Sequence, residues 1–190
     1  MVALTRRVSK LGWVATQQER RTGTRRAIVE AAFAAYQRVG SPEVPLETIA
    51  GKAGVTKATI HYHFRNRSGL MRAVAIWLFR RIELKVDRAK GRRNESPAAR
   101  YVRALLSEQA TPAGRVLFTL GDELARSGDL GDIDPYQYLV TRLGGFGVSK
   151  SPSVTAAAIT QYGRQLAYGL MPVSEINAVV KALVQDGRLH

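Results

Sequence analysis

Apolar residues recur at helical spacing along most of the chain, and no stretch of useful length alternates between apolar and polar residues as a strand does. Thr24 can cap the first periodic stretch and Gly40 can end it, while Ser68 can cap the fourth. At about 1.5 Å per residue that fourth helix would be about 30 Å long. The pattern predicts an all-α fold whose first four helices cover residues 25–39, 46–53, 57–63 and about 68–89.

A domain boundary is expected at residues 90–97, which are polar and charged and end in a proline. Beyond it, glycine and proline residues separate further apolar stretches. We expect helices there at about 98–110, 113–127, 135–144, 153–170 and 174–186.

The second and third helices form a predicted helix-turn-helix. Gly54 lies between them, where the chain must bend without a clash from a Cβ atom. The hydroxyl of Thr56 can cap the helix that follows. That helix carries a face dense in hydrogen-bonding groups, and such a helix can read DNA in the major groove. Its polar residues are Lys57, Thr59, His61, Tyr62 and His63.

The run GVTKATIHYHFRNRSGL resembles the signature of the tetracycline-repressor (TetR) family, and the resemblance extends over roughly residues 25–75. The chain has Arg67 where the family usually has Lys, and Pro45 where it usually has Thr. Arg67 keeps the charge, whereas Pro45 can begin a helix but offers no hydroxyl to a phosphate. The resemblance is carried by Gly54, Thr56, His61, Tyr62, His63, Phe64, Arg67 and Leu70.

DNA contacts divide into those that read bases and those that hold the backbone. Lys57, Thr59 and His61 lie near the exposed face of the predicted recognition helix. Lys57 can donate to guanine, and the Thr59 methyl group can meet a thymine methyl group. The residues that resemble phosphate-binding positions of the family are Tyr62, His63 and Arg67, with Thr56 as a cap first and a phosphate donor second.

The net charge of +14 is confined to the first half of the chain, because residues 1–93 hold 20 Lys and Arg against 6 Asp and Glu, while residues 94–190 hold 9 against 9. A basic DNA-binding module joined to a neutral module explains this division. Residues 1–23 are expected to be a flexible basic arm in which Arg20 and Arg21 are candidate DNA contacts. The arm either contacts phosphates or the minor groove, or is a tail that only adds charge.

The resemblance also implies a helix-turn-helix domain over residues 24–70 and a helical regulatory and dimerisation domain over 71–190. The family places a pocket for a small effector between the fourth helix and those after it, lined by apolar and aromatic groups. Each aromatic residue taken alone is more often a core residue than a ligand contact. The candidates for the pocket are Trp77, Tyr101, Phe118, Tyr138, Phe146 and Tyr162.

The last two predicted helices carry clear apolar stripes. Such stripes can pack inward, but the family pairs these helices with their twins in a four-helix dimer interface. A two-fold dimer requires a near-palindromic operator. The candidate interface residues are Ile159, Leu166, Ile176, Val180 and Leu183.

An enzyme is not expected, because the chain has no cysteine, no Gly-rich phosphate loop after a strand and no serine elbow. His61 and His63 point apart on a helix, so neither a metal nor a cofactor is expected. No apolar run approaches a membrane span, and we expect a cytoplasmic protein. The leading interpretation is a homodimeric repressor that a small molecule of unknown class releases from double-stranded operator DNA. The alternative is a nonspecific or architectural DNA-binding protein.

Overall fold

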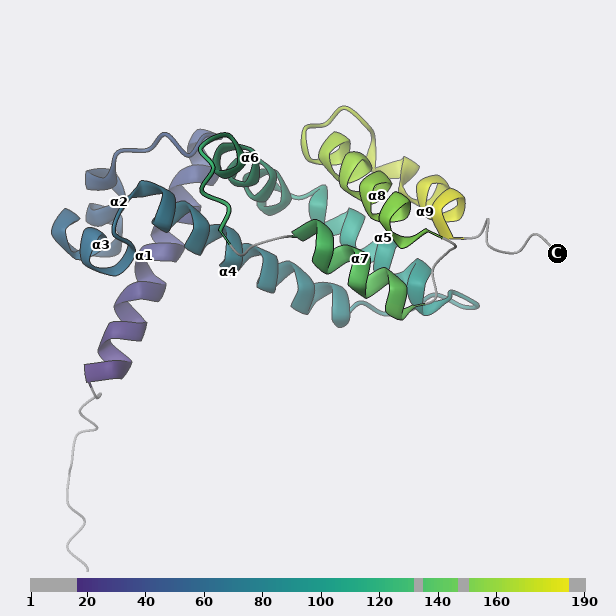
Figure 1. Cartoon of the computed structure of the whole chain (residues 1–190), viewed down its shortest axis with the longest axis horizontal. Coiled ribbons are helices and arrows are strands. Elements are labelled where there is room, and N and C mark those ends of the chain that lie inside the picture. Colours follow the sequence, from purple (N-terminus) through teal and green to yellow (C-terminus); the bar gives the residue numbers. More distant parts are fainter. Residues whose placement is uncertain (1–16, 132–134, 147–150, 185–190) are drawn as a thin grey trace, which may run out of the picture.

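The computed structural model describes residues 17–131, 135–146 and 151–184, and these residues form helices and connecting loops without a strand (Figure 1). This agrees with the predicted all-α fold. None of the described helices is both long enough and apolar enough to cross a membrane. The helices are α1 Gln17–Val39, α2 Leu46–Ala53, α3 Lys57–Phe64, α4 Arg67–Asp87, α5 Pro97–Gln109, α6 Pro112–Arg126, α7 Pro135–Gly145, α8 Pro152–Ala167, the 3₁₀ helix η1 Val173–Glu175 and α9 Ile176–Val184.

Several helix ends follow directly from local sequence. Ser96 and Thr111 each cap a helix by accepting a hydrogen bond from the backbone N–H three residues later, and each is followed by a proline at the first helical position. Gly54 ends α2 with a φ angle of 66°, in the left-handed region that favours glycine. These boundaries need no tertiary contact to specify them.

Two helix starts differ from the sequence-based expectation. α1 begins at Gln17 rather than near Thr24, so residues 17–23 of the expected flexible arm are helical, and residues 1–16 lie outside the described part of the chain. Residues 17–23 are polar all round, and a helix without an apolar stripe leaves no periodic signal. α4 is capped by Asn66, whose side chain accepts from Gly69 N, rather than by Ser68.

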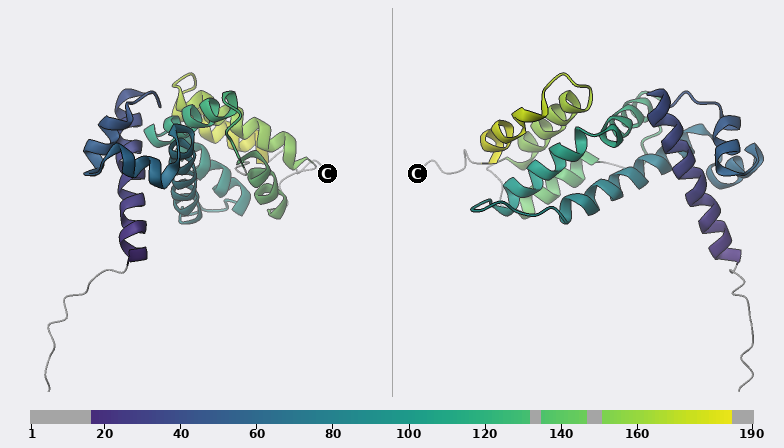
Figure 2. Two further views of the ribbon diagram at one scale, coloured as in Figure 1. Left: turned by 60° about the vertical axis from the view of Figure 1, so that its left-hand side comes forward. Right: turned by 180° about the vertical axis from the view of Figure 1, so that it is seen from behind.

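The molecule has two hydrophobic cores, and α4 contributes to both of them. At its start, Leu70 and Val74 pack in the first core with α1, α2 and α3. Toward its end, Ile82 and Val86 pack in the second core with α5, α7, α8 and α9. The helix therefore runs as a rod between the two halves of the molecule (Figures 1 and 2).

Helix α6 connects the two halves a second time. Val116, Leu120 and Leu124 of α6 belong to the first core, although α6 lies within the segment predicted to form the C-terminal domain. Leu117 packs against both cores. A displacement of α6 would therefore change the packing of the first core, which lies beneath the helix-turn-helix.

Candidate nucleic-acid interface and ligand cavity

Helix α3 is held by its apolar side and exposes its polar side. Ile60 and Phe64 are buried in the first core, with 1% and 5% of their surface exposed. Tyr62 lies between them in sequence and is 68% exposed. Lys57 and His61 are also exposed, while Thr59 and His63 are half-buried. The exposed face of α3 thus presents a cation, an imidazole and a phenol.

Contacts within the chain orient these side chains. Thr56 Oγ1 accepts from Thr59 N at 3.2 Å and so caps α3. Lys57 Nζ lies 2.6 Å from Glu47 Oε1, in an ion pair that a base contact by this lysine would have to replace. His61 Nδ1 lies 3.0 Å from Arg65 O. A carbonyl oxygen only accepts, so Nδ1 donates, and Nε2 of the neutral ring remains an acceptor.

Arg67 ties the start of α4 to the loop between α1 and α2. Its Nη1 donates to Pro42 O at 3.0 Å and to Val44 O at 2.7 Å. The guanidinium group has five N–H donors, so these bonds leave others unused. A phosphate contact by Arg67 stays a prediction for those remaining donors.

The N-terminal part of α1 brings further positive charge to α3. The guanidinium carbon of Arg21 lies 5.6 Å from the centre of the Tyr62 ring. That of Arg25 lies 4.5 Å from the centre of the Phe64 ring, and its Nη1 donates to His63 O at 2.9 Å. Arg20 and Arg21 line, with Tyr62 and other residues, a hollow of about 600 Å³ between the two helices.

The same neighbours act on His63. Burial, followed by the charges of Arg21 and Arg25, lowers the pKa of His63 below its ordinary value. The neutral ring is therefore favoured in the free protein. Sequence analysis missed Arg25, although its spacing of four residues from Arg21 would place both on one face of a helix.

A cavity of about 290 Å³ lies among α4, α5, α6, α7 and α8. Of the residues expected in a ligand pocket, Tyr101, Phe118 and Tyr138 line it. Its lining also includes two further aromatic residues, Phe79 on α4 and Tyr136 on α7. Helix α4 thus lines the cavity with residues between Ala75 and Glu83, in the middle and second half of the helix.

Three of the expected pocket residues lie outside this lining. Trp77 packs against Phe33 with ring centres 5.4 Å apart and joins the first core. Phe146 packs behind Tyr101 with ring centres 5.2 Å apart. Tyr162 is half-buried against the second core. Composition alone could not separate these packing roles from a place in the cavity wall.

Glu83 is a buried carboxylate in the cavity wall, and sequence analysis missed it because charged residues usually lie at the surface. The hydroxyl of Tyr101 donates to its Oε1 at 3.2 Å, and that of Tyr138 donates to its Oε2 at 2.8 Å. Burial raises the pKa of Glu83 above its ordinary value, and the two hydroxyls and Arg142 oppose that rise. Burial and the bond to Glu83 raise the pKa of Tyr138 to about 12.

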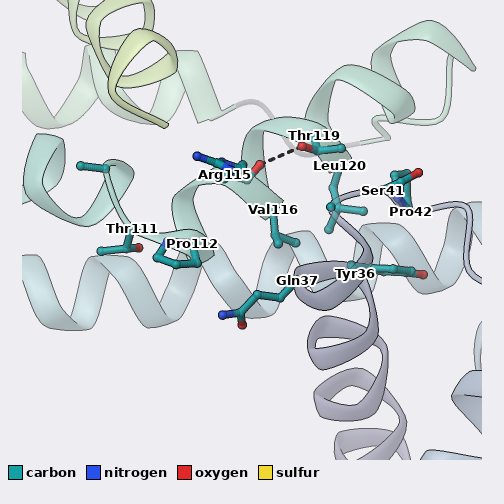
Figure 3. A pocket seen from close by; sticks show the side chains of 12 residues that line it. Tyr36, Gln37, Ser41, Pro42, Thr111, Pro112, Arg115, Val116, Thr119 and Leu120 are labelled. Carbon is teal, nitrogen blue, oxygen red and sulfur yellow. Dashed lines mark hydrogen bonds between the residues drawn. The ribbon is translucent and has the colours of Figure 1, made fainter. Parts of the chain in front are cut away.

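A second hollow, of about 350 Å³, lies where the end of α1 meets α6 (Figure 3). Tyr36 and Gln37 line it from α1, and Arg115 and Thr119 line it from α6. In Figure 3 the Thr119 hydroxyl donates to Arg115 O, at 3.0 Å. The hollow is therefore bounded by groups from both halves of the molecule.

The expected dimer residues lie inside the protomer. Ile159, Leu166, Ile176 and Val180 are buried in the second core, and Leu183 is half-buried against it. The apolar stripes of α8 and α9 therefore pack against α5 and its neighbours, and the four buried residues are not free to form an interface. Apolar residues are exposed at other positions, Val154, Tyr168, Leu170 and Val173.

Comparison with known proteins places the helix-turn-helix within one family. The family model described as bacterial regulatory proteins, tetR family, matches residues 28–74. The uncharacterised HTH-type transcriptional regulator TtgW of Pseudomonas putida is 37% identical over 51 residues, which are 27% of this chain and 38% of TtgW. The HTH-type transcriptional regulator BetI of Yersinia pestis is 36% identical over 58 residues, 30% of this chain and 29% of BetI. Each match thus spans less than half of the relative.

Solved structures resemble the chain over most of its length. The multidrug binding protein EbrR, complexed with imidazole, has a TM-score of 0.72 and 16% identity, covering 90% of this chain and 97% of that one. A TetR-family regulator from Mesorhizobium loti has a TM-score of 0.62 and 19% identity, covering 88% and 96%. The regulator LfrR of Mycobacterium smegmatis, in complex with proflavine, has a TM-score of 0.59 and 25% identity, covering 90% and 99%.

Proposed function

Because this chain belongs to the TetR family of bacterial transcriptional regulators, we propose that it is a homodimeric repressor which a small effector releases from a palindromic operator. The observation that carries the proposal is the polar face of α3, which lies exposed beside the arginines of α1. A short helix with this face fits the major groove, and the flanking cations fit the phosphates beside it. The named relatives are transcriptional regulators and not enzymes, in line with this proposal.

We assign the DNA contacts by the chemistry of each side chain. Lys57, Thr59 and His61 contact base edges, and Tyr62 and His63 contact phosphates. The helical start of α1 adds further phosphate contacts through Arg20 and Arg21. Phosphate contacts raise affinity for any sequence, whereas the base contacts supply the choice of operator.

The dimer would use the faces of α8 and α9 that the protomer leaves exposed. Positions 154, 157 and 161 are exposed and recur at helical spacing, so they share one face of α8, and Tyr168 lies exposed directly after the helix. Leu170, with 77% exposure, and Val173, with 60%, extend that apolar surface toward α9. A second copy of this face would bury these side chains and set the spacing of the two recognition helices.

Effector release would be carried by α4, which lines the cavity and also packs in the first core. An effector that favours one position of α4 would change the spacing of the two recognition helices without any chemical step. Shifting the equilibrium from almost all bound to almost all free requires about a 10⁴-fold preference for the released form. EbrR with imidazole and LfrR with proflavine are similar proteins that hold small molecules, which supports an effector here.

Selection of DNA fragments by the purified protein tests the proposal. Enriched fragments should share a near-palindromic site, and affinity for it should exceed affinity for random DNA by at least about 10³ at fixed salt. Sedimentation of the protein should show a dimer, and Leu170→Glu should produce a monomer. A monomer with equal affinity for every duplex would refute the repressor and favour an architectural DNA-binding protein.

A repressor acts where the chromosome lies, so the proposal implies a cytoplasmic location.

A further inference from the structure

The wall of the cavity beside α4 is largely aromatic and aliphatic. Phe79 and Tyr138 meet edge to face with ring centres 4.9 Å apart, and Phe118 and Tyr136 add further rings. Such a wall favours a ligand with an apolar, aromatic body. Aromatic faces also attract cations, as Arg164 illustrates by lying 5.5 Å from the centre of the Phe118 ring.

The carboxylate of Glu83 can still accept hydrogen bonds from two more donors. Each of its oxygens accepts one tyrosine hydroxyl, and each oxygen has two lone pairs. Arg142 Nε lies 4.0 Å from Oε2, beyond hydrogen-bonding distance, and its guanidinium group bonds Asp87 instead. A ligand donor that reaches Glu83 would therefore take up acceptor capacity that the protein leaves unused.

The charges around the cavity leave a net negative charge of one. Among the lining residues, Asp122 is paired with Arg164 at 2.5 Å, so Glu83 remains. Behind Glu83, the charges of Asp87 and Arg142 cancel each other. An anionic ligand would be repelled, and a neutral ligand would displace water from a carboxylate without compensating it. A ligand with one positive charge compensates the carboxylate.

A second acceptor in the wall also lacks a donor. Gln109 lines the cavity, and its Oε1 is buried without a hydrogen-bond partner among the described residues. A Cβ atom at Gly163 would lie 2.0 Å from this oxygen, so glycine at that position makes space for the amide. An unsatisfied buried acceptor is costly, but this oxygen is turned toward Gly163 and has almost no exposed surface, so it adds no contact for a ligand.

We propose that the effector of this cavity is a lipophilic aromatic cation, whose charged N–H group binds Glu83 and whose ring system packs among Phe79, Phe118 and Tyr138. The proposal rests on the proposed effector role of the cavity and adds the chemical class of the ligand. The preference for a cation arises from the carboxylate, and the preference for an aromatic body arises from the wall.

Three probes with one ring system separate charge from shape. They are 9-aminoacridine as the cation, acridine as the neutral molecule and acridine-9-carboxylate as the anion, each titrated into the full chain without DNA at mildly alkaline pH. Fluorescence should show the cation binding at least about tenfold more tightly than acridine, and the anion most weakly, because opposite charges attract strongly in a partly buried site. Equal affinities, a preference for the anion, or no binding by any probe would overturn the proposal.

Variants then locate the charge effect. Glu83→Gln keeps the size of the side chain, and we expect it to weaken 9-aminoacridine about tenfold while changing acridine by less than about twofold. Equal weakening of both probes would count against a charge interaction. Glu83→Asp, which keeps the charge, should retain the order of the probes even if Glu83→Gln does not fold. Thr119→Val, in the hollow between α1 and α6, is the control and should change neither affinity.

Operator binding by the same preparations separates the two proposals. If the protein selects an operator but binds the three probes with equal affinity, only the proposed ligand class is wrong. If it selects no operator yet binds the cation through Glu83, the ligand class stands and the repressor proposal fails.

Discussion

Removal of the Tyr62 hydroxyl is the sharpest test of how α3 holds DNA. The ring is 68% exposed, and no described residue forms a hydrogen bond with its hydroxyl. Tyr62→Phe keeps the ring, and with it the contacts to Arg21 at 5.6 Å and to the His63 ring at 5.1 Å. The variant should therefore fold with unchanged stability and lose only the proposed bond to a phosphate.

The size of the effect follows from the kind of bond. A hydrogen bond to a charged group contributes about 1.5–3 kcal/mol. The lower value corresponds to about a tenfold loss of affinity for each half-site. A dimer on two half-sites loses two such bonds, so the operator affinity should fall by about a hundredfold.

Fluorescence anisotropy with labelled operator and with random DNA, over a series of salt concentrations, measures this loss. A phosphate contact requires a similar loss per contact on both DNAs and an unchanged salt slope, because no charge is removed. Tyr162→Phe, at a half-buried tyrosine of α8 that packs against the second core, is the control and should bind DNA as the unaltered chain does. A loss confined to one base position, or no loss at all, would refute the phosphate role.

Further predictions concern stability. Leu78→Ala, in the fully buried part of α4, should lower the free energy of unfolding by about 2–5 kcal/mol in urea titrations, whereas Leu84→Ala, at a 55% exposed position of the same helix, should change it by less than about 0.5 kcal/mol. Gly69→Ala would bring a Cβ atom to 2.1 Å from a carbonyl oxygen of α3 and should abolish operator binding or folding, while Gly51→Ala, with open space around it, should preserve both. An arginine side chain lowers the pKa of Glu95 from 4.5 to about 2, so its stabilising contribution is present above about pH 4.5 and is lost as the pH falls toward 2. Thermal melts of Glu95→Gln should therefore depend less on pH across that interval than those of the unaltered chain, and parallel curves would contradict the assignment.

Much of the N-terminal half could be predicted because its signals are local. Gly54, the Thr56 cap and the buried pair Ile60 and Phe64 fix the bend and the orientation of α3 within a few residues of one another. Proline and a capping hydroxyl likewise begin α5 and α6. The sequence also shows which side chains an exposed helix face carries, whereas contacts such as that of Lys57 with Glu47 appear only in the structure.

The C-terminal half was less predictable because its important contacts join distant segments. An apolar stripe indicates that one face of a helix is buried. It does not indicate whether the same protomer or a second protomer covers that face. For that reason the stripes predict an interface position for Ile159 and Ile176, whereas both residues pack in the second core. Trp77 was similarly assigned to a pocket, although it packs against Phe33.

By itself, the sequence determined an all-α chain with a helix-turn-helix in a basic first half and a neutral helical remainder. Only the tertiary structure decided which groups meet. Glu83, Tyr101 and Tyr138 come from three helices, and the carboxylate can be buried in the cavity wall because both hydroxyls reach it. Arg21 and Arg25 reach α3 because α1 extends past it as a helix. The periodicity of a segment indicates which of its faces is buried. The side chains that meet in a functional site depend instead on how distant segments pack together.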